Sequence, residues 1–255
     1  MDLGLDGRRI MVGGASRGLG AAIATAVAAE GARVAAVARE SADLTATAER
    51  VGGTAIPADL TTADGPADAV RRAIDALGGL DGLVVNSGGP PFGKFEALDE
   101  AAWEQAIQGT LLAAIRAIRT ALPALREGRD PAILIILSSS VREPIPSLAT
   151  SNVLRPGLNG LIKSLVSEIV PIRINGIAPG RIDTERIRTL DRGRAESTGT
   201  SVEQVQAATR ARIPLGRYGE PEEVGRVGAF LLSPAASYVN GVVVAVDGGM
   251  IQSLP

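Results

Sequence analysis

Short apolar runs alternate with longer helical stretches along the chain. The apolar runs predict seven strands, at residues 10–13, 32–38, 53–59, 80–86, 132–137, 172–177 and 241–246. The stretches between them predict helices, the clearest at residues 21–30, 65–77, 101–126 and 151–169. This strict alternation predicts an α/β fold, a doubly wound seven-stranded parallel sheet with helices on both faces. The length of 255 residues suits a single domain spanning residues 1–255.

Two segments depart from the regular pattern. Residues 181–212 are polar and charged without a clean period, and we interpret residues 184–212 as a lid over a substrate pocket. In the helix expected at 151–169, Pro156 directly follows Arg155. Proline lacks a backbone N–H and disfavours helical geometry in the residue before it. We therefore expect this helix to start late or to kink at Pro156.

A glycine-rich turn joins the first predicted strand to the first predicted helix. It contains Gly14, Gly18 and Gly20. Such a turn leaves backbone N–H groups free beside the positive end of a helix, which suits the pyrophosphate of a nucleotide. The spacing is Gly-x-x-x-Gly-x-Gly rather than the Gly-x-Gly-x-x-Gly fingerprint. A plain glycine loop is therefore the alternative interpretation.

Composition restricts the chemistry that the chain can perform. Hydrophobic residues make up 45% of the chain and aromatic residues only 2%, and there is neither cysteine nor histidine. A core of small aliphatic side chains suits a parallel sheet covered by closely packed helices. Without cysteine and histidine, thiolate nucleophiles, imidazole bases and the usual zinc and copper sites are excluded, and we expect no metal. Any general acid or base must be a carboxylate, Lys, Tyr or an activated hydroxyl.

Charge and hydropathy also limit the partners that we expect. The formal net charge is −2 and no basic run stands out, so nucleic acid is not an expected partner. The polar N-terminal stretch lacks the apolar region of a signal peptide, and no apolar run is long enough to span a membrane. We expect a cytoplasmic protein without a membrane partner.

Several short motifs follow one another in a fixed order. They are Gly14-x-x-x-Gly18-x-Gly20, Asp59-Leu60, Asn86-Ser-Gly88-Gly89, Asn175-Gly-Ile-Ala-Pro179-Gly180-x-Ile182-x-Thr184, Pro214-Leu-Gly216-Arg217-x-Gly219-x-Pro221-Glu222-Glu223-Val224 and Val246-Asp247-Gly248-Gly249. Each motif is modest by itself, but their order makes the set specific. Over essentially its full length the chain resembles the short-chain dehydrogenase/reductase family.

The resemblance implies a Rossmann-type domain that binds a nicotinamide dinucleotide, acts on a small-molecule substrate and forms a homo-oligomer, a dimer or a tetramer. It implies that the glycine turn holds the pyrophosphate and that later motifs flank the adenine, the ribose and the nicotinamide. The cofactor-binding residues expected from the matching positions and their neighbours are Gly14, Ser16, Arg17, Gly18, Leu19, Gly20, Arg39, Asp59, Leu60, Asn86, Gly88, Arg155, Pro179, Gly180, Ile182 and Thr184.

Two arginines bear on the choice between NAD(H) and NADP(H). An acidic residue at the end of the second strand would bind a ribose 2′-hydroxyl and select NAD. This chain has Arg39 there, and Arg17 lies within the glycine turn. Two converging guanidinium groups suit a 2′-phosphate, so we predict NADP(H) over NAD(H). The alternative is that both are solvated surface arginines, with Glu40 beside Arg39.

The catalytic positions match the family least well. The family uses a serine after the fifth strand, and a tyrosine and a lysine four residues apart on the next helix. Alignment places Ser138 at the serine position but Ser151 and Arg155 at the tyrosine and lysine positions, and Thr110 at a position where the family has asparagine. No Tyr-x-x-x-Lys sequence exists elsewhere in the chain. We therefore predict Ser138, Ser151 and Arg155 as the residues of a non-standard catalytic site.

Other roles for these residues remain open. Ser151 could cap a helix N-terminus instead of acting in catalysis. Arg155 could bind the nicotinamide ribose or form a surface salt bridge. Glu143, in the loop after Ser138, could substitute as acid or base or could simply be solvated.

Three functions therefore compete. The leading one is an atypical NADP(H)-dependent carbonyl reductase or alcohol dehydrogenase, in which water, Ser151 or Glu143 delivers the proton. The others are a non-redox enzyme such as a dehydratase or cyclase, and a catalytically silent dinucleotide-binding protein, because a fold does not fix a function.

Overall fold

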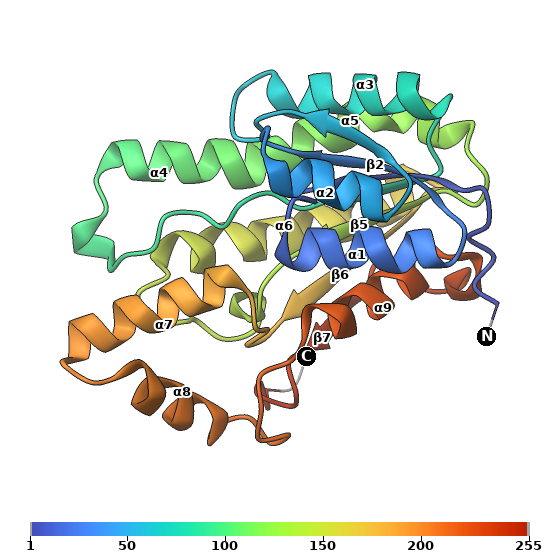
Figure 1. Cartoon of the computed structure of the whole chain (residues 1–255). Helices are drawn as coiled ribbons and strands as arrows, with labels where there is room; N and C mark the ends of the chain where they lie inside the picture. The colour runs from blue at the N-terminus through green and yellow to red at the C-terminus, as the bar shows by residue number, and fades with distance from the viewer. Residues whose placement is uncertain (1, 254–255) are drawn as a thin grey trace.

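A seven-stranded parallel sheet forms the centre of the protein in a computed structural model that describes residues 2–253 (Figure 1). The strand order is β3-β2-β1-β4-β5-β6-β7, and every neighbouring pair is parallel. This confirms the predicted fold class. The strands are β1 (Arg9–Gly13), β2 (Arg33–Ala38), β3 (Thr54–Pro57), β4 (Gly82–Val85), β5 (Ala132–Ile136), β6 (Arg173–Pro179) and β7 (Val243–Val246).

Helices cover both faces of the sheet (Figure 1). The helices are α1 (Gly18–Ala29), α2 (Ala42–Arg50), α3 (Gly65–Leu77), α4 (Glu100–Ala106), α5 (Ala113–Arg126), α6 (Ala149–Glu168), α7 (Glu185–Thr198), α8 (Val202–Arg210) and α9 (Pro221–Leu232). One hydrophobic cluster joins the sheet to α1, α2 and α9, and the other joins it to α3, α5 and α6. The core therefore consists of two apolar layers separated by the sheet.

Strand β5 lies at the centre of the core. Its five residues are all buried, as its wholly apolar sequence predicts. Leu134 belongs to the cluster with α1 and α9, whereas Ile133 and Ile135 belong to the cluster with α3, α5 and α6. Successive side chains of a strand point to opposite faces, so β5 anchors both layers. Each such aliphatic side chain contributes about 1.5–3 kcal/mol through burial.

The helix predicted at residues 101–126 is interrupted. It consists of α4, a π-helical turn over Ile107–Leu112, and α5. At this turn the hydroxyl of Ser87 donates a hydrogen bond to the carbonyl of Gly109, at 2.7 Å. Insertions of this kind interrupt the regular hydrogen-bond ladder and are invisible to apolar periodicity.

Of the two expectations for the next helix, a late start at Pro156 is wrong, whereas a kink at Pro156 stays a prediction. Helix α6 begins at Ala149 and runs through Pro156. Proline removes one N–H from the ladder. The buried side chains of Leu154, Arg155 and Leu158 nevertheless hold this part of the helix against the sheet.

The predicted lid segment contains two helices that periodicity did not indicate. The side chain of Thr184 caps α7 by accepting a hydrogen bond from the Ile187 N–H, and Ser201 forms a capping box with Gln204 at the start of α8. Helix α7 buries only Asp191 and Ala195 and carries no hydrophobic stripe, and α8, which buries Val205 and Thr209, is only nine residues long. Their capping residues were the usable signal. Among the described helices, none is long and apolar enough to cross a membrane.

An ion pair joins the starts of two central strands. The carboxylate of Asp81, just before β4, accepts hydrogen bonds from Nε and Nη2 of Arg9 at 3.0 and 2.8 Å, and also from the backbone N–H groups of Arg9 and Arg129. Burial by itself raises the pKa of Asp81, but these hydrogen bonds outweigh it and lower the pKa to about 2. The charged carboxylate therefore stabilises the folded state.

We predict that Asp81→Asn lowers the free energy of unfolding by about 2 kcal/mol at pH 7. The folded-state pKa lies below the ordinary value of 3.8, so the stabilisation is complete above that value and is lost as the pH falls toward 2. Urea unfolding of both proteins between pH 7 and pH 3 should show the difference shrinking as the pH is lowered. A difference that is constant with pH would contradict this account.

Candidate active site

The expected site lies at the edge of the sheet where the strands end. Because all strands are parallel, β1, β4, β5 and β6 end on the same side. Strand order reverses between β1 and β4, since the chain continues from β1 outward to β2 and β3 and then returns to β4. Ligands of such sheets bind in the crevice at this reversal.

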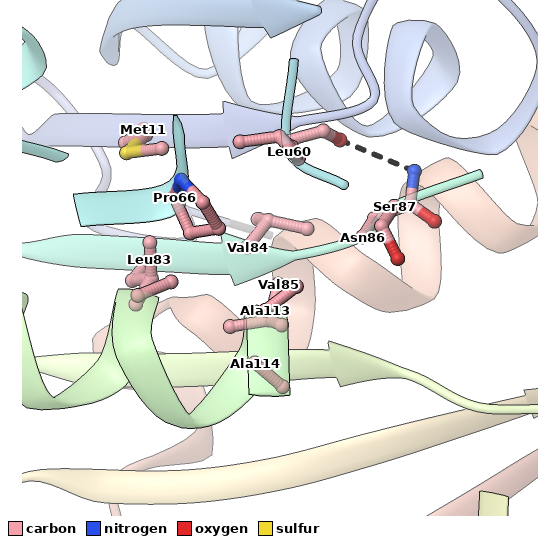
Figure 2. Close-up of a pocket in the computed structure, with 12 residues that line it drawn as sticks. Met11, Leu60, Pro66, Leu83, Val84, Val85, Asn86, Ser87, Ala113 and Ala114 are labelled. Atoms are coloured by element: carbon pink, nitrogen blue, oxygen red, sulfur yellow. Dashed lines mark hydrogen bonds between the residues drawn. The ribbon is translucent and has the colours of Figure 1, made fainter. Parts of the chain in front are cut away.

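The glycine turn packs directly against the end of β4. Gly14 has a φ of +60°, and a Cβ there would lie 2.6 Å from Nδ2 of Asn86. The same amide nitrogen donates a hydrogen bond to the carbonyl of Gly13, at 3.1 Å (Figure 2). At Gly20, an added Cβ would collide with the carbonyl of Gly14. Only glycine allows these approaches, so the predicted turn residues Gly14 and Gly20 and the predicted Asn86 form one unit.

The first turn of α1 presents backbone donors to this crevice. Its N-cap residue, Arg17, is extended, and within the described chain no side chain caps this helix. The side chain of Thr184 lies beside Gly18, 3.5 Å from where a Cβ would be. The hydroxyl of Thr47 donates a hydrogen bond to the backbone carbonyl of Ser16 and fixes its position. Free N–H groups at a helix start suit a phosphate, so the geometry fits the pyrophosphate of a dinucleotide.

Two exposed arginines lie beside the turn. Neither Arg17 nor Arg39 forms an ion pair with any residue between 2 and 253. Arg39 directly follows the buried end of β2 and lies near Asp59. Hydrogen bonds from the backbone N–H and hydroxyl of Thr61 lower the pKa of Asp59, and Arg39 lowers it further. Both guanidinium groups are thus available to a phosphate outside the helix start.

A small apolar cavity adjoins the glycine turn. Figure 2 shows Leu60 and Pro66 on one side of it, and Val84 and Asn86 on the side of β4. The structure thus brings the predicted residues Leu60 and Asn86 to one cavity. Gly88 follows in the loop after β4, where space is open around it.

The predicted nicotinamide residues follow β6. Pro179 ends the strand and pairs with Val246 of β7. Gly180 packs so closely on Asp247 that a Cβ would lie 2.6 Å from that side chain, and Ile182 forms a bridge to Gly219. These residues lie at the same sheet edge as the glycine turn. Leu19, in the first turn of α1, instead packs partly against the core.

The predicted serines lie on two segments joined by a third serine. Ser138 follows β5, and its Oγ accepts a hydrogen bond from the Ser140 N–H at 3.1 Å, which leaves its hydroxyl hydrogen free. Ser151 lies within the first turn of α6 and is 6% exposed, with its Oγ 3.1 Å from Oγ of Ser140. The N-cap of α6 is Leu148, so Ser151 is not the cap residue. Ser140 was missed by the sequence analysis, although the run of three serines was its signal.

Arg155 lies under the end of β5. It is only 8% exposed, and its Nη1 donates a hydrogen bond to the carbonyl of Ile136. It forms no salt bridge with any described carboxylate, so a surface salt bridge is not its role. Burial lowers its pKa to about 10, with a further contribution from Arg186. At neutral pH Arg155 therefore remains a buried cation.

Two other candidate positions lie nearby. Glu143 is exposed in the loop after Ser138 and makes no side-chain hydrogen bond within the described residues. Thr110, in the π-helical turn, is 3% exposed, and its hydroxyl oxygen lacks a partner in the part of the chain that is described. Across residues 2–253, no group of three or more acidic residues could hold a metal ion.

A buried carboxylate anchors the predicted lid. Asp191, on α7, is 1% exposed and accepts a hydrogen bond from the Tyr218 hydroxyl at 2.9 Å. Nη1 of Arg181 lies 3.6 Å from its other oxygen. Burial raises the pKa of Tyr218 and the nearby carboxylate raises it further, so this hydroxyl stays protonated as a donor. The three residues hold α7 against the loop after α8.

Comparisons with known proteins agree with this geometry. The family described as enoyl-(acyl carrier protein) reductase matches residues 14–251. The inactive 2-(S)-hydroxypropyl-CoM dehydrogenase 2 of Xanthobacter autotrophicus is 32% identical over 86% of this chain and 95% of its own length. The L-sorbose reductase of Gluconobacter frateurii, solved with NADPH and L-sorbose, is 29% identical, with a TM-score of 0.92 and 100% coverage of both chains. An NADPH-bound short-chain oxidoreductase of Pseudomonas aeruginosa with an atypical catalytic centre is 28% identical, with a TM-score of 0.85 and coverage of 98% and 100%.

We predict that Tyr218→Phe loosens α7, because it removes the hydroxyl donor of the buried Asp191. The loss should lower the free energy of unfolding by about 1–3 kcal/mol. Hydrogen exchange of the α7 amides should become faster. The control is Tyr238→Phe, since Tyr238 is fully exposed and should leave both quantities unchanged. Equal exchange in the two variants would refute the anchoring role.

Proposed function

Because this chain belongs to the short-chain dehydrogenase/reductase family, whose members are NAD(P)-dependent oxidoreductases, we propose that it is an NADP(H)-dependent enzyme that interconverts a carbonyl compound and an alcohol at a non-standard site. The observation that carries the proposal is the position of Ser138 and Arg155. Both lie at the end of β5, on the same sheet edge as the glycine turn and the uncapped start of α1.

The roles of the chain's own residues follow from their geometry. When bound, NADPH supplies the hydride. Ser138 keeps a free hydroxyl hydrogen that can bind the substrate oxygen. The buried cation of Arg155 lies beside the expected position of the nicotinamide and stabilises negative charge on oxygen atoms bound there. The proton comes from water, Ser151 or Glu143, because an alkyl hydroxyl alone is a weak acid.

The preference for NADP(H) is supported by charge. Arg17 and Arg39 form no ion pair with described residues and lie at the glycine turn and at the end of β2. A 2′-phosphate on the adenosine ribose would form ion pairs with both guanidinium groups. No carboxylate ends β2 in the position that would bind a 2′-hydroxyl, since Glu40 follows Arg39.

A catalytically silent dinucleotide-binding protein is the second candidate. One observation favours it: the hydroxyl of Ser151, which occupies the family's tyrosine position, is buried and already paired with Ser140. A hydroxyl held in this way is not presented to a substrate. Turnover separates the two candidates, because both would bind NADPH.

We also propose a single domain spanning residues 1–255, with residues 184–212 as its substrate lid, that works in the cytoplasm as a homo-oligomer, a dimer or a tetramer. The sheet shared by all seven strands supports one domain. Exposed apolar side chains on the π-helical turn and on α6, Ile107 and Val153, support contact with a second copy.

We predict that Arg39→Glu weakens NADPH binding by about tenfold or more, because it replaces an attractive charge by a repulsive one at the 2′-phosphate. Binding of NADH should not weaken. Fluorescence titration of both nucleotides checks this. The control is Arg33→Glu, since Arg33 is an exposed arginine at the opposite end of β2. If the two variants bind NADPH equally well, the assignment of Arg39 fails.

We predict that Ser138→Ala lowers kcat/KM about 10²-fold without changing the affinity for NADPH, because it removes the donor to the substrate oxygen. The measurement is NADPH oxidation over a panel of ketones, quinones and imines. Ser151→Ala should have a smaller effect, since its hydroxyl is paired with Ser140. Absence of turnover with NADPH bound would favour the silent protein.

A further inference from the structure

Arg155 is a buried charge without a counter-charge. Its one hydrogen bond to another described residue goes to a neutral carbonyl, that of Ile136. Burying an unpaired cation is costly, so buried arginines normally face carboxylates. Arg155 is not among the buried polar groups that lack a partner, so its remaining N–H groups reach accessible space. They are therefore placed to bind a group that enters the site.

A second arginine, on α7 of the predicted lid, lies at the same edge of the sheet. Nη2 of Arg186, on α7, donates a hydrogen bond to the carbonyl of Pro90 at 2.8 Å. Its guanidinium lies over Gly89, where a Cβ would be 2.9 Å from Nε. The absence of a side chain at Gly89 thus lets the guanidinium reach the loop after β4.

Two other arginines of α7 form ion pairs, whereas Arg186 forms none with a described residue. Arg188 pairs with Asp183 at 2.9 Å, and Arg192 pairs with Glu185. Arg181 precedes the helix, and its Nη1 lies 3.6 Å from the carboxylate of the buried Asp191. Arg186 has no carboxylate within reach among the described residues, although it is the one anchored beside the active site.

Hydrogen bonds place Arg155 and Arg186 at the ends of two neighbouring strands, Arg155 at the carbonyl of Ile136 in β5 and Arg186 at the carbonyl of Pro90 in the loop after β4. The charge of Arg186 also lowers the pKa of Arg155, after the larger effect of burial. Two like charges repel, and neither is neutralised by a described side chain. An anion bound between them would offset this repulsion and would accept hydrogen bonds from both guanidinium groups.

We propose that Arg155 and Arg186 together bind a carboxylate carried by the substrate, so that the enzyme acts on a keto acid or hydroxy acid. The inference rests on the proposed function, because it assigns the substrate class of the same site. The phosphates of the cofactor are the other source of a suitable anion, and the experiment separates the two.

The test measures binding rather than turnover. Protein saturated with NADP⁺, which cannot reduce a ketone, is titrated by calorimetry with acetoacetate and with its methyl ester, and then with phenylpyruvate and its methyl ester. In at least one pair the acid should bind about tenfold or more tightly than the ester. Arg186→Gln should abolish that difference, whereas Arg188→Gln should retain it. All three proteins should bind NADP⁺ equally.

Three results would overturn the proposal. One is equal affinity, or no binding, for the acid and ester of both pairs. Another is an acid preference that survives in Arg186→Gln. The third is a loss of NADP⁺ affinity in Arg186→Gln without any change in acid binding, which would assign the anion to the cofactor. If wild-type protein does not bind NADP⁺, the proposed function fails, and titration of cofactor-free protein still tests the arginine pair.

Discussion

The contact between the glycine turn and Asn86 fixes the geometry on which the site depends. The Asn86 amide binds the carbonyl of Gly13 and lies so close to Gly14 that no side chain fits there. This contact joins the end of β1 to the end of β4 across the strand reversal. It therefore sets where α1 begins and where its free N–H groups point. The remaining parts of the site are arranged around that helix start.

The candidate site contains a buried charge without a described counter-charge. The alignment of the sequence with the family predicts Ser151 and Arg155 at the tyrosine and lysine positions. The hydroxyl of Ser151 is hydrogen-bonded to that of Ser140. Arg155 is a buried cation, and its one hydrogen bond to another described residue goes to a backbone carbonyl. A guanidinium binds oxygen atoms and stabilises negative charge, but it does not readily give up its proton. The site is therefore better suited to holding anionic oxygen than to donating a proton from its own side chains.

The sequence was sufficient for the sheet, because burial on both faces requires apolar runs such as β5, and these runs are local. It was not sufficient for α7 and α8. These helices are held by their capping residues and by one buried carboxylate, that of Asp191. The glycine turn was predicted correctly as a turn, because a positive φ and close packing against neighbouring backbone require glycine at these positions. The Ser140–Ser151 contact and the approach of Arg186 to Arg155 could not be predicted, since each depends on how separate segments pack in three dimensions.

A crystal structure with NADPH bound tests the central claim most directly. The account predicts the pyrophosphate on the N–H groups between Ser16 and Gly20, the 2′-phosphate beside Arg39, and the nicotinamide next to Ser138 and Arg155. A dinucleotide bound elsewhere, or a crevice at the β1–β4 reversal that NADPH does not enter at saturating concentration, would contradict it.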